Sequence, residues 1–504
     1  MTRASSASGR WTELDGKRSG FIRRCERLSQ LTLRKICPED SYDQETDDGR
    51  NDWQSVGATA VNHMANRLML TMFAPSRPNF RLEPTPRLLK MAADNDLTEE
   101  DLAAMLSQAE HKAARVLDKE KARPRLYEIL KHLIVTGNGL LRRDDGIRVM
   151  GLKNYCARRS ISGKLIELVI KETLLFDEID TDAQEQLAGK FAPDDQIDFY
   201  IWCKLEGKKY KVTQWVDEHP LSGKFIGDYA ERDFPYHAIT WDLSDRANYG
   251  TGLVEEYAGE FEALSSLSEA MIGAAILASE FRWLANPAGM TSANDLLNSE
   301  NGSVLPGVKG DIEILHAGKM GELDVMMHMT EASINRIGRG FLLNSAVTRD
   351  AERVTAEEIR LMAQELETGH GGVYSRLSID LQEPIVYWEL SKIEIKIDEK
   401  DVEPIIITGL DALSRNGDLE NLKLFLADCG SVNTLPPAAL GALRIDAIYR
   451  DLATGRGLIS SKYVKSQAEA AQEQAQAQQS QVEMTAANAA AQTAGENIAS
   501  PQEA

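Results

Sequence analysis

Apolar residues recur every three or four positions through much of the first quarter of the chain, a spacing that places them on one face of a helix. Prolines 75, 78, 84 and 86 then break the chain into extended pieces, because proline cannot donate a backbone hydrogen bond. The predicted helices are residues 11–37, 54–73, 98–121 and a helix that begins at Pro124. The clearest inward-facing stripe consists of Val56, Ala60, Val61, Met64, Leu68 and Met72.

The pattern changes to short β-rich runs between about residue 139 and residue 241. Asn138-Gly139 is a turn signal, and Glu206–Lys209 has the composition of a hairpin connection. The predicted strands are residues 140–141, 147–149, 165–170, 199–205 and 210–216. A β-rich part beside long helices predicts an α+β protein that is mainly helical.

Two further long helices are predicted over residues 253–280 and 322–343, on either side of a glycine- and asparagine-rich excursion. The second helix carries two stripes. One repeats at steps of four and three, which is typical of a seam between neighbouring helices, and contains Leu323, Met327, Thr330, Ile334, Ile337 and Phe341. The other stripe is polar and contains Asp324, His328, Glu331, Asn335 and Arg339.

A helix with a sharp beginning follows a polar loop in the C-terminal third. Thr355 and Glu358 form a capping box, in which each side chain satisfies the other's free backbone N–H. The helix is predicted to be interrupted at Gly369–Gly372 and to resume through Ile385.

Beyond this helix, apolar and polar residues alternate over residues 393–408, which predicts one or two strands. Residues 417–428 and 436–453 are predicted to be helical. The last segment, residues 466–504, is rich in Ala, Gln and Glu. Its composition is found both in disordered low-complexity tails and in stable helices, so both interpretations stay open.

Composition places the chain among ordinary globular proteins, with 43% apolar residues among 504 and room for three or four domains. Its formal net charge is −21. Tight binding to DNA normally needs a basic footprint, so firm capture of phosphates is disfavoured. The acidic balance is explained either by solubility or by a surface that lets DNA pass without sticking.

No set of residues with the spacing of a catalytic or metal-binding motif is found in the sequence. The five cysteines are scattered, which indicates free thiols in a reducing compartment, and neither a secretion signal nor a membrane span is predicted. Gly137-Asn138-Gly139 and Gly250-Thr251-Gly252 are better explained as turns than as phosphate loops. We therefore predict no enzymatic activity, cofactor or metal.

Three runs in the chain carry a resemblance to a known family: residues 55–84, 135–141 and 351–386. In the same order, they resemble the head-to-tail connector (portal) proteins of T7-like short-tailed bacteriophages. Together with weaker likeness, the resemblance covers most of residues 11–455. It implies a ring, expected to be a dodecamer, with a central channel at one capsid vertex.

The resemblance also implies a division of the chain into the parts of a portal subunit. The wing is residues 1–252, the first stem helix 253–285, the clip 286–321, the second stem helix 322–343, the tunnel loop 344–354, a kinked wing helix and strand 355–400, the crown 401–465, and the tail 466–504, which could line up as a helical barrel.

The expected function is a conduit for DNA packaging, retention and ejection. Tentative channel residues are Arg349 and Arg353 of the tunnel loop and the polar stripe Asp324, His328, Glu331, Asn335 and Arg339. The alternative for the stripe is a solvated helix face, and the alternative for the two arginines is ion pairing within the ring. The implied partners are double-stranded DNA without sequence specificity, major capsid and scaffolding proteins, terminase, a tail adaptor and internal core proteins, but no membrane. The implied location is the virion vertex, and the host cytoplasm during assembly. A different structural ring protein, such as a tail adaptor, or a metal-dependent nuclease remains an alternative.

Overall fold

The computed structural model divides the chain into two compact units, Met1–Gly409 and Leu410–Ala504. In the second unit, residues 425–430 are helical and overlap the end of the predicted helix 417–428. The structure describes residues 6–43, 46, 52–74, 78–94, 99–144, 146–279, 281–316, 320–343, 368–393, 402–406, 425–430, 448, 449 and 452.

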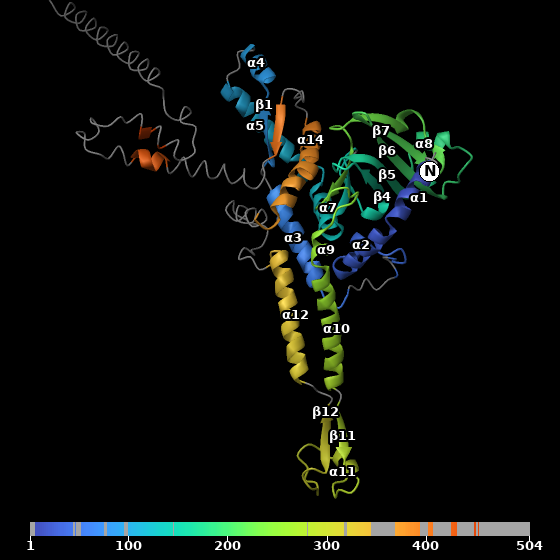
Figure 1. The fold of residues 1–504 in the computed structure, drawn as a ribbon, viewed down its shortest axis with the longest axis vertical. Coiled ribbons are helices and arrows are strands. Elements are labelled where there is room, and N and C mark those ends of the chain that lie inside the picture. Colours follow the sequence, from blue (N-terminus) through green and yellow to red (C-terminus); the bar gives the residue numbers. More distant parts are fainter. Residues whose placement is uncertain are drawn as a thin grey trace, which may run out of the picture. The chain divides into compact units, whose positions relative to one another are not determined.

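The largest hydrophobic core of the first unit is mainly helical (Figure 1). Its centre is the packing of α3 against α7, where Met64, Leu130 and Leu133 are fully buried. The N-terminal helices of this unit are α1 (Ala7–Lys17), α2 (Ser19–Leu31), α3 (Val56–Met72), α4 (Pro86–Asp94), α5 (Glu99–Ala114), α6 (Val116–Lys119) and α7 (Arg123–Thr136), with a 3-10 turn η1 (Arg34–Ile36).

The prediction of a single helix over residues 11–37 is wrong, because the chain forms two helices that meet at Arg18. The Arg18 side chain is 4% exposed, and its Nη1 donates to the carbonyls of Leu152 at 2.8 Å and Tyr155 at 2.6 Å. A buried guanidinium needs such acceptors, so this long-range anchor fixes the chain where the two helices meet.

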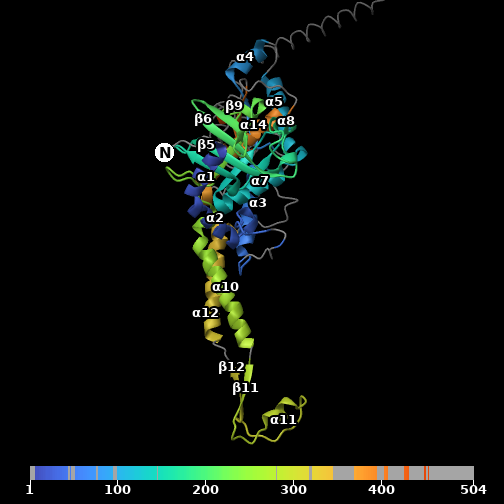
Figure 2. The same cartoon turned by 90° about the vertical axis from the view of Figure 1, so that its right-hand side faces the viewer.

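A six-stranded antiparallel sheet forms the β-rich part, with the order β4-β5-β6-β7-β8 and with β9 also paired to β7 (Figures 1 and 2). Its strands are β4 (Tyr155–Arg159), β5 (Leu165–Leu175), β6 (Gln196–Glu206), β7 (Lys209–Val216), β8 (His219–Pro220) and β9 (Ile226–Ala230), with α8 (Thr181–Gln186) between β5 and β6. A smaller sheet has the order β10-β2-β3, from β2 (Asn138–Arg142), β3 (Arg148–Met150) and β10 (Tyr236–Thr240). The predicted α+β class is confirmed.

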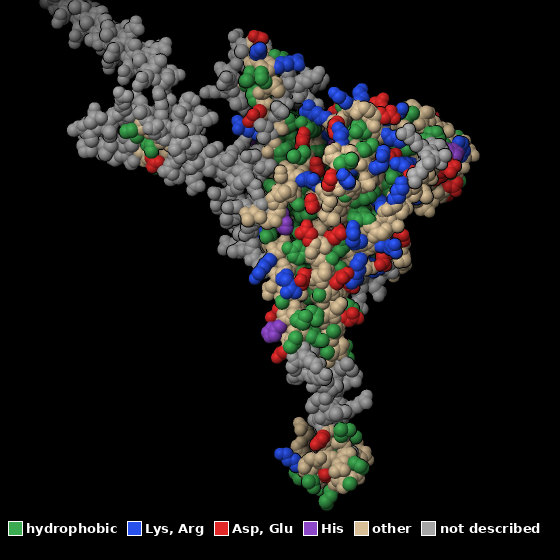
Figure 3. Space-filling model, viewed as in Figure 1, with side chains coloured by type: hydrophobic (Ala, Val, Ile, Leu, Met, Phe, Trp, Pro, Cys, Tyr) green, Lys and Arg blue, Asp and Glu red, His purple; other side chains and the backbone are tan. Residues whose placement is uncertain are grey.

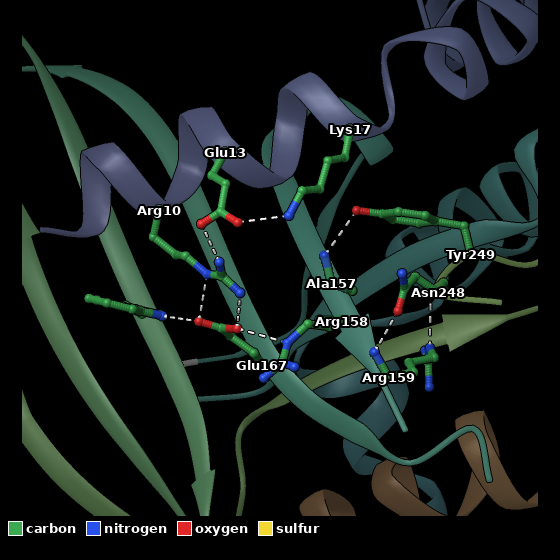
Figure 4. Close-up of polar contacts among 10 residues, drawn as sticks. Arg10, Glu13, Lys17, Ala157, Arg158, Arg159, Glu167, Asn248 and Tyr249 are labelled. Atoms are coloured by element: carbon green, nitrogen blue, oxygen red, sulfur yellow. Dashed lines mark hydrogen bonds and ion pairs between the residues drawn. The ribbon is translucent and has the colours of Figure 1, made fainter. Parts of the chain in front are cut away.

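Helix α1 is attached to the large sheet by the buried carboxylate of Glu167 (Figure 4). Its Oε1 accepts from Arg10 Nε at 3.0 Å and Trp202 Nε1 at 2.9 Å, and its Oε2 accepts from Arg10 Nη2 at 2.7 Å and Arg158 Nε at 3.0 Å. Burial alone would raise the pKa of Glu167, but the hydrogen bonds from Arg10 and Trp202 outweigh it and lower the pKa. The paired charge therefore stabilises the docked helix.

Segments far apart in the sequence meet where β1 (Phe80–Pro84) pairs antiparallel with β13 (Val402–Ile406). The strand predicted within residues 393–408 is thus found in its second half. Glu110 of α5 also holds this pair, because its carboxylate accepts the Leu82 N–H at 2.8 Å.

The predicted interruption at Gly369–Gly372 is wrong, since residues 368–377 form a continuous helix. Glycine weakens a helix by only about 1 kcal/mol, which packing of the buried face, here Tyr374 and Leu377, readily offsets. The irregularity lies further on, in a π-helical turn η6 (Ser378–Gln382) that leads into α14 (Glu383–Ser391).

Candidate functional site

Two long antiparallel helices, α10 (Ala258–Ser279) and α12 (Met320–Gly340), pack side by side (Figures 1 and 2). Helix α10 follows the short α9 (Leu253–Glu256). The chain between the pair contains the hairpin β11 (Phe281–Ala285) and β12 (Ile312–His316), with α11 (Ala293–Leu297) in its loop. The predicted helix 322–343 agrees with α12 to within a few residues, whereas the predicted helix 253–280 is divided at Tyr257 into α9 and α10.

An aromatic cluster fixes the two helices at one end of the pair. Phe341 is fully buried and meets Tyr257 and Phe261 edge-on, with ring centroids 5.6 and 5.7 Å apart. Gly340 is required here, because a Cβ at this position would lie 2.2 Å from Cζ of Tyr257.

Polar contacts fix the register along the helices. Arg336 donates to both carboxylate oxygens of Glu260 at 2.8 Å, a bidentate pair that holds the pKa of Glu260 below its ordinary value. Thr330 Oγ1 lies 3.5 Å from the sulfur of Met271 and donates to the Met326 carbonyl at 2.9 Å. The pair is therefore held by apolar packing at one end and by specific polar contacts along its length.

The predicted seam of α12 is found in part. Ile337 and Phe341 are fully buried and Thr330 is half-buried, but Met327 is 49% and Ile334 37% exposed. The reason is geometric: at 100° per residue, Met327 and Ile334 lie 60–80° away from Ile337, beyond the reach of the partner helix α10. The side chain of Leu323 lies outside the described residues.

The polar stripe of α12 is exposed over its whole length. The structure places all five of its residues on one face: Asp324, His328, Glu331, Asn335 and Arg339. Along this face, His328 Nδ1 lies 3.9 Å from Glu331 Oε2. The tunnel-loop residues Arg349 and Arg353 lie outside the described residues.

Exposed apolar side chains border the polar stripe on both sides, a feature that the sequence analysis missed. Met327 and Ile334 form the first flank, while Val325 and Met329, which are 59% and 54% exposed, form the second. Figure 3 shows that apolar side chains gather on the paired helices, on the face seen in that view. We call the two pairs the α12 flanks. Apolar residues outside the seam positions of 322–343 were the signal that could have revealed the second flank.

Helix α10 adds to this exposed apolar surface through Ile272 and Ile276, which are 46% and 58% exposed. They lie one turn apart, and therefore on the same face of the helix. Scattered apolar side chains are normal on a protein surface, whereas a continuous set on a helix pair marks an interaction surface.

The loop between β11 and β12 is ordered around Asp311. Its Oδ2 accepts from the backbone N–H of Thr291 at 3.0 Å and from the Thr291 hydroxyl at 2.9 Å. The loop held in this way displays Met290, Val304 and Val308, which are 85%, 97% and 57% exposed. It is therefore a preorganised apolar surface that the described residues leave exposed.

The two glycine motifs pack against each other, as expected for turns. Asn138 Nδ2 donates to the Gly250 carbonyl at 2.8 Å, and the Gly250 N–H donates to Asn138 Oδ1 at 2.8 Å. Gly137 has φ +73°, and a Cβ there would lie 2.3 Å from the backbone carbon of Thr251. These glycines are thus explained by close backbone approach.

Within the described ranges, no group of three or more His, Cys, Asp and Glu side chains could hold a metal ion. In the same part of the chain, no helix is both long and apolar enough to cross a membrane.

Comparison with known proteins identifies the family. The model of the bacteriophage head to tail connecting protein family matches residues 4–461, so the chain belongs to this family. The portal protein of Enterobacteria phage SP6 is 33% identical over 471 residues, which cover 92% of this chain and 90% of that protein. The portal protein of Escherichia phage T7 is 32% identical over 434 residues, 82% of this chain and 80% of that protein. The predicted relationship to portal proteins of T7-like phages is confirmed.

A solved structure described as the neck of an empty GTA particle with C6 symmetry aligns at a TM-score of 0.40 and 11% identity, over 81% of this chain and 90% of that chain.

Proposed function

We propose that copies of this chain close into a ring, a dodecamer by the family resemblance, whose central channel passes double-stranded DNA at one capsid vertex. The observation that carries the proposal is the arrangement of α12, in which a polar stripe is bordered by the two apolar α12 flanks. In this ring, the chain acts as the portal subunit, with α10 and α12 as the stem.

Each face of α12 then has a definite neighbour. The face that carries Ile337 and Phe341 packs against α10 of the same chain. A subunit in a ring has one neighbour on each side, and the two flanks supply one apolar surface for each. The polar stripe remains, and it faces the channel, where polar side chains stay solvated.

The charge of the stripe suits passage rather than capture. The stripe has two carboxylates, Asp324 and Glu331, and one guanidinium, that of Arg339, so each copy contributes net negative charge when histidine is counted as neutral. DNA phosphates are repelled weakly by such a surface, while firm binding would require many unopposed cations. In the proposed tunnel loop, Arg349 and Arg353 touch passing phosphates transiently.

The loop between β11 and β12 serves as the clip in this proposal. Its exposed Met290, Val304 and Val308 provide an apolar surface for the terminase during packaging and for the tail adaptor afterwards. Energy for packaging comes from the terminase. Major capsid, scaffolding and internal core proteins contact other parts of the ring.

Light scattering after size-exclusion chromatography tests the ring, since it gives the mass of the assembly without a standard. The purified chain, alone or with its scaffolding protein, should elute as one species of many copies. Elution only as a monomer of 55.8 kDa under both conditions contradicts the proposal.

The role in DNA passage is tested separately by reversing the charge of Arg349 and Arg353 to Glu. The variant should form the same assembly but package or retain less DNA. Normal packaging and retention would remove these arginines from the mechanism.

A further inference from the structure

The two α12 flanks point in nearly opposite directions. At about 100° per residue, Val325 and Met329 lie roughly 160–220° from Met327 and Ile334 when the angle is measured across the polar stripe. In a closed ring, the two neighbours of a copy are separated by the interior angle of a regular polygon, which is about 60° for three copies and about 90° for four. The separation of the flanks therefore fits a ring of many copies better than a trimer or a tetramer.

Helix α10 lies on the side of α12 that is turned away from the polar stripe. The face of α12 that meets α10 is centred near Ile337, and the middle of the stripe lies about 160° further around the helix. When the stripe faces a channel, α12 therefore forms an inner layer and α10 an outer layer. The two lateral sides of the helix pair are left to meet neighbouring copies.

One lateral side of the pair is marked by the ion pair between Arg336 and Glu260. On α12, Arg336 lies within about 20° of Val325 and Met329, so all three residues point to the same side of the pair. We call this lateral side, with the second α12 flank and the ion pair, the ion-pair side.

The opposite lateral side combines apolar residues of both helices. On α10, Ile272 and Ile276 lie about 120–160° from Glu260, measured past the face that meets α12, and therefore point away from the ion pair. On α12, this side carries Met327 and Ile334. All four of these apolar side chains are exposed, and we call them together the isoleucine side. The helix pair thus has two different apolar sides.

The two apolar sides lie at the same level along the helix pair. Met271 of α10 is level with Thr330 of α12, since the sulfur and the hydroxyl oxygen lie 3.5 Å apart. The helices run antiparallel and rise about 1.5 Å per residue, so Ile272 and Ile276 lie within about one turn of the level of Met327. Rotation about a channel axis moves no residue along that axis. With the helix pair along the axis, the isoleucine side of one copy is therefore level with the second α12 flank of the next.

We propose that neighbouring copies meet through a heterologous contact, in which the isoleucine side of one copy packs against the ion-pair side of the next. Met327 of one copy inserts between Val325 and Met329 of its neighbour, which are one helical turn apart and form the hole for this knob. A heterologous contact uses two different surfaces and closes into a ring, whereas an isologous contact pairs a surface with itself and ends at a dimer. The inference rests on the proposed ring and specifies which surfaces of two copies touch.

Disulfide cross-linking tests the pairing, because a disulfide forms only between cysteines whose Cβ atoms lie about 3.5–4.5 Å apart. The variant Met327→Cys, Met329→Cys carries one thiol on each lateral side. Mild oxidation of the assembled protein should link each copy to both neighbours, so a non-reducing denaturing gel should show a ladder whose last band counts the copies in the ring. All variants also carry Cys429→Ser, because the other four native cysteines are buried.

The matched controls are the two single-cysteine variants, Met327→Cys and Met329→Cys. Identical residues of neighbouring α12 helices are separated by about the helix spacing of 8–10 Å, beyond the reach of a disulfide, so neither control should be linked. The variant Val325→Cys, Met327→Cys places a second pair in the same contact, and it decides the test if Met329→Cys prevents assembly.

A ladder in the double variants, with no linked species in the controls, is the expected result. Disulfide dimers in a single-cysteine control would show an isologous contact and overturn the inference. Double variants that assemble to the parental mass and form no ladder would overturn the pairing and leave the proposed ring intact. A parent chain that does not assemble in light scattering would instead overturn the proposed ring and this inference together.

Discussion

The second α12 flank offers the sharpest perturbation of the proposed ring. Val325 and Met329 are 59% and 54% exposed in the single chain, and the ring would cover them. Full burial of a side chain of this size contributes about 1.5–3 kcal/mol, so covering the remaining half of both contributes about 1.5–3 kcal/mol per contact. Replacing both with Asp removes this contribution and adds the desolvation of two carboxylates, which costs several kcal/mol.

The double variant Val325→Asp, Met329→Asp should therefore weaken each contact by at least about 4 kcal/mol, or about a thousandfold in affinity. The matched control is His328→Asp, Asn335→Asp, which adds two carboxylates to the same helix on the polar stripe. Light scattering at equal protein concentration should show a monomer for the flank variant and the parental assembly for the control.

Circular dichroism should show that both double variants keep the parental helix content, because the changed side chains are exposed in the single chain. A flank variant with the parental mass would refute the assignment of this flank to a subunit contact. Loss of assembly in both variants would instead indicate that added charge alone, at any position of α12, prevents the ring.

Three further predictions concern stability, measured as the free energy of unfolding in urea. Gly137→Ala should lose about 3–5 kcal/mol, from a strained positive φ together with overlap with the backbone of Thr251; a loss below 1 kcal/mol would contradict the close approach. Glu167→Gln should lose about 3 kcal/mol at pH 7, because Arg10 loses its buried partner. Since the folded pKa of Glu167 is lowered, the difference should shrink as the pH falls below the unfolded value of about 4.5, and a constant difference would argue against the ion pair. Burial raises the pKa of Glu389 well above its ordinary value, so the parent protein should lose stability as the pH rises above about 4.5. The variant Glu389→Gln should not show this loss. Identical pH profiles of the parent and the variant would show that Glu389 is not buried.

Helices with an uninterrupted apolar stripe could be predicted from the sequence to within a few residues, except that the predicted helix 253–280 is divided at Tyr257 into α9 and α10. Helices α3, α7, α10 and α12 belong to this group, since their spacing alone determines which face is buried. The glycines at 369–372 misled the prediction because local propensity is weaker than packing, whereas the effect of Pro384 on the hydrogen-bond ladder was not anticipated.

Strands β4, β9 and β10 were not predicted, and of these only β10 has a pairing partner far away in the chain. Strand β10 pairs with β2 across about a hundred residues, with Tyr236 opposite Arg142. Such pairing depends on the assembled core and leaves little local periodicity. The candidate site also depends on the assembled fold. The polar stripe could be predicted from the sequence, but the flanks could be identified only from the structure, in which α10 covers one face of α12.

The central claim is that many copies of α12 surround a channel with their polar stripes inward. A three-dimensional reconstruction of the purified assembly by electron microscopy tests it most directly, because it shows both the hole and the orientation of each helix. The account predicts an annulus in which Asp324, His328 and Arg339 border the opening and Val325 and Met329 lie between subunits. An assembly without a central opening, or one in which the polar stripe faces outward, would contradict it.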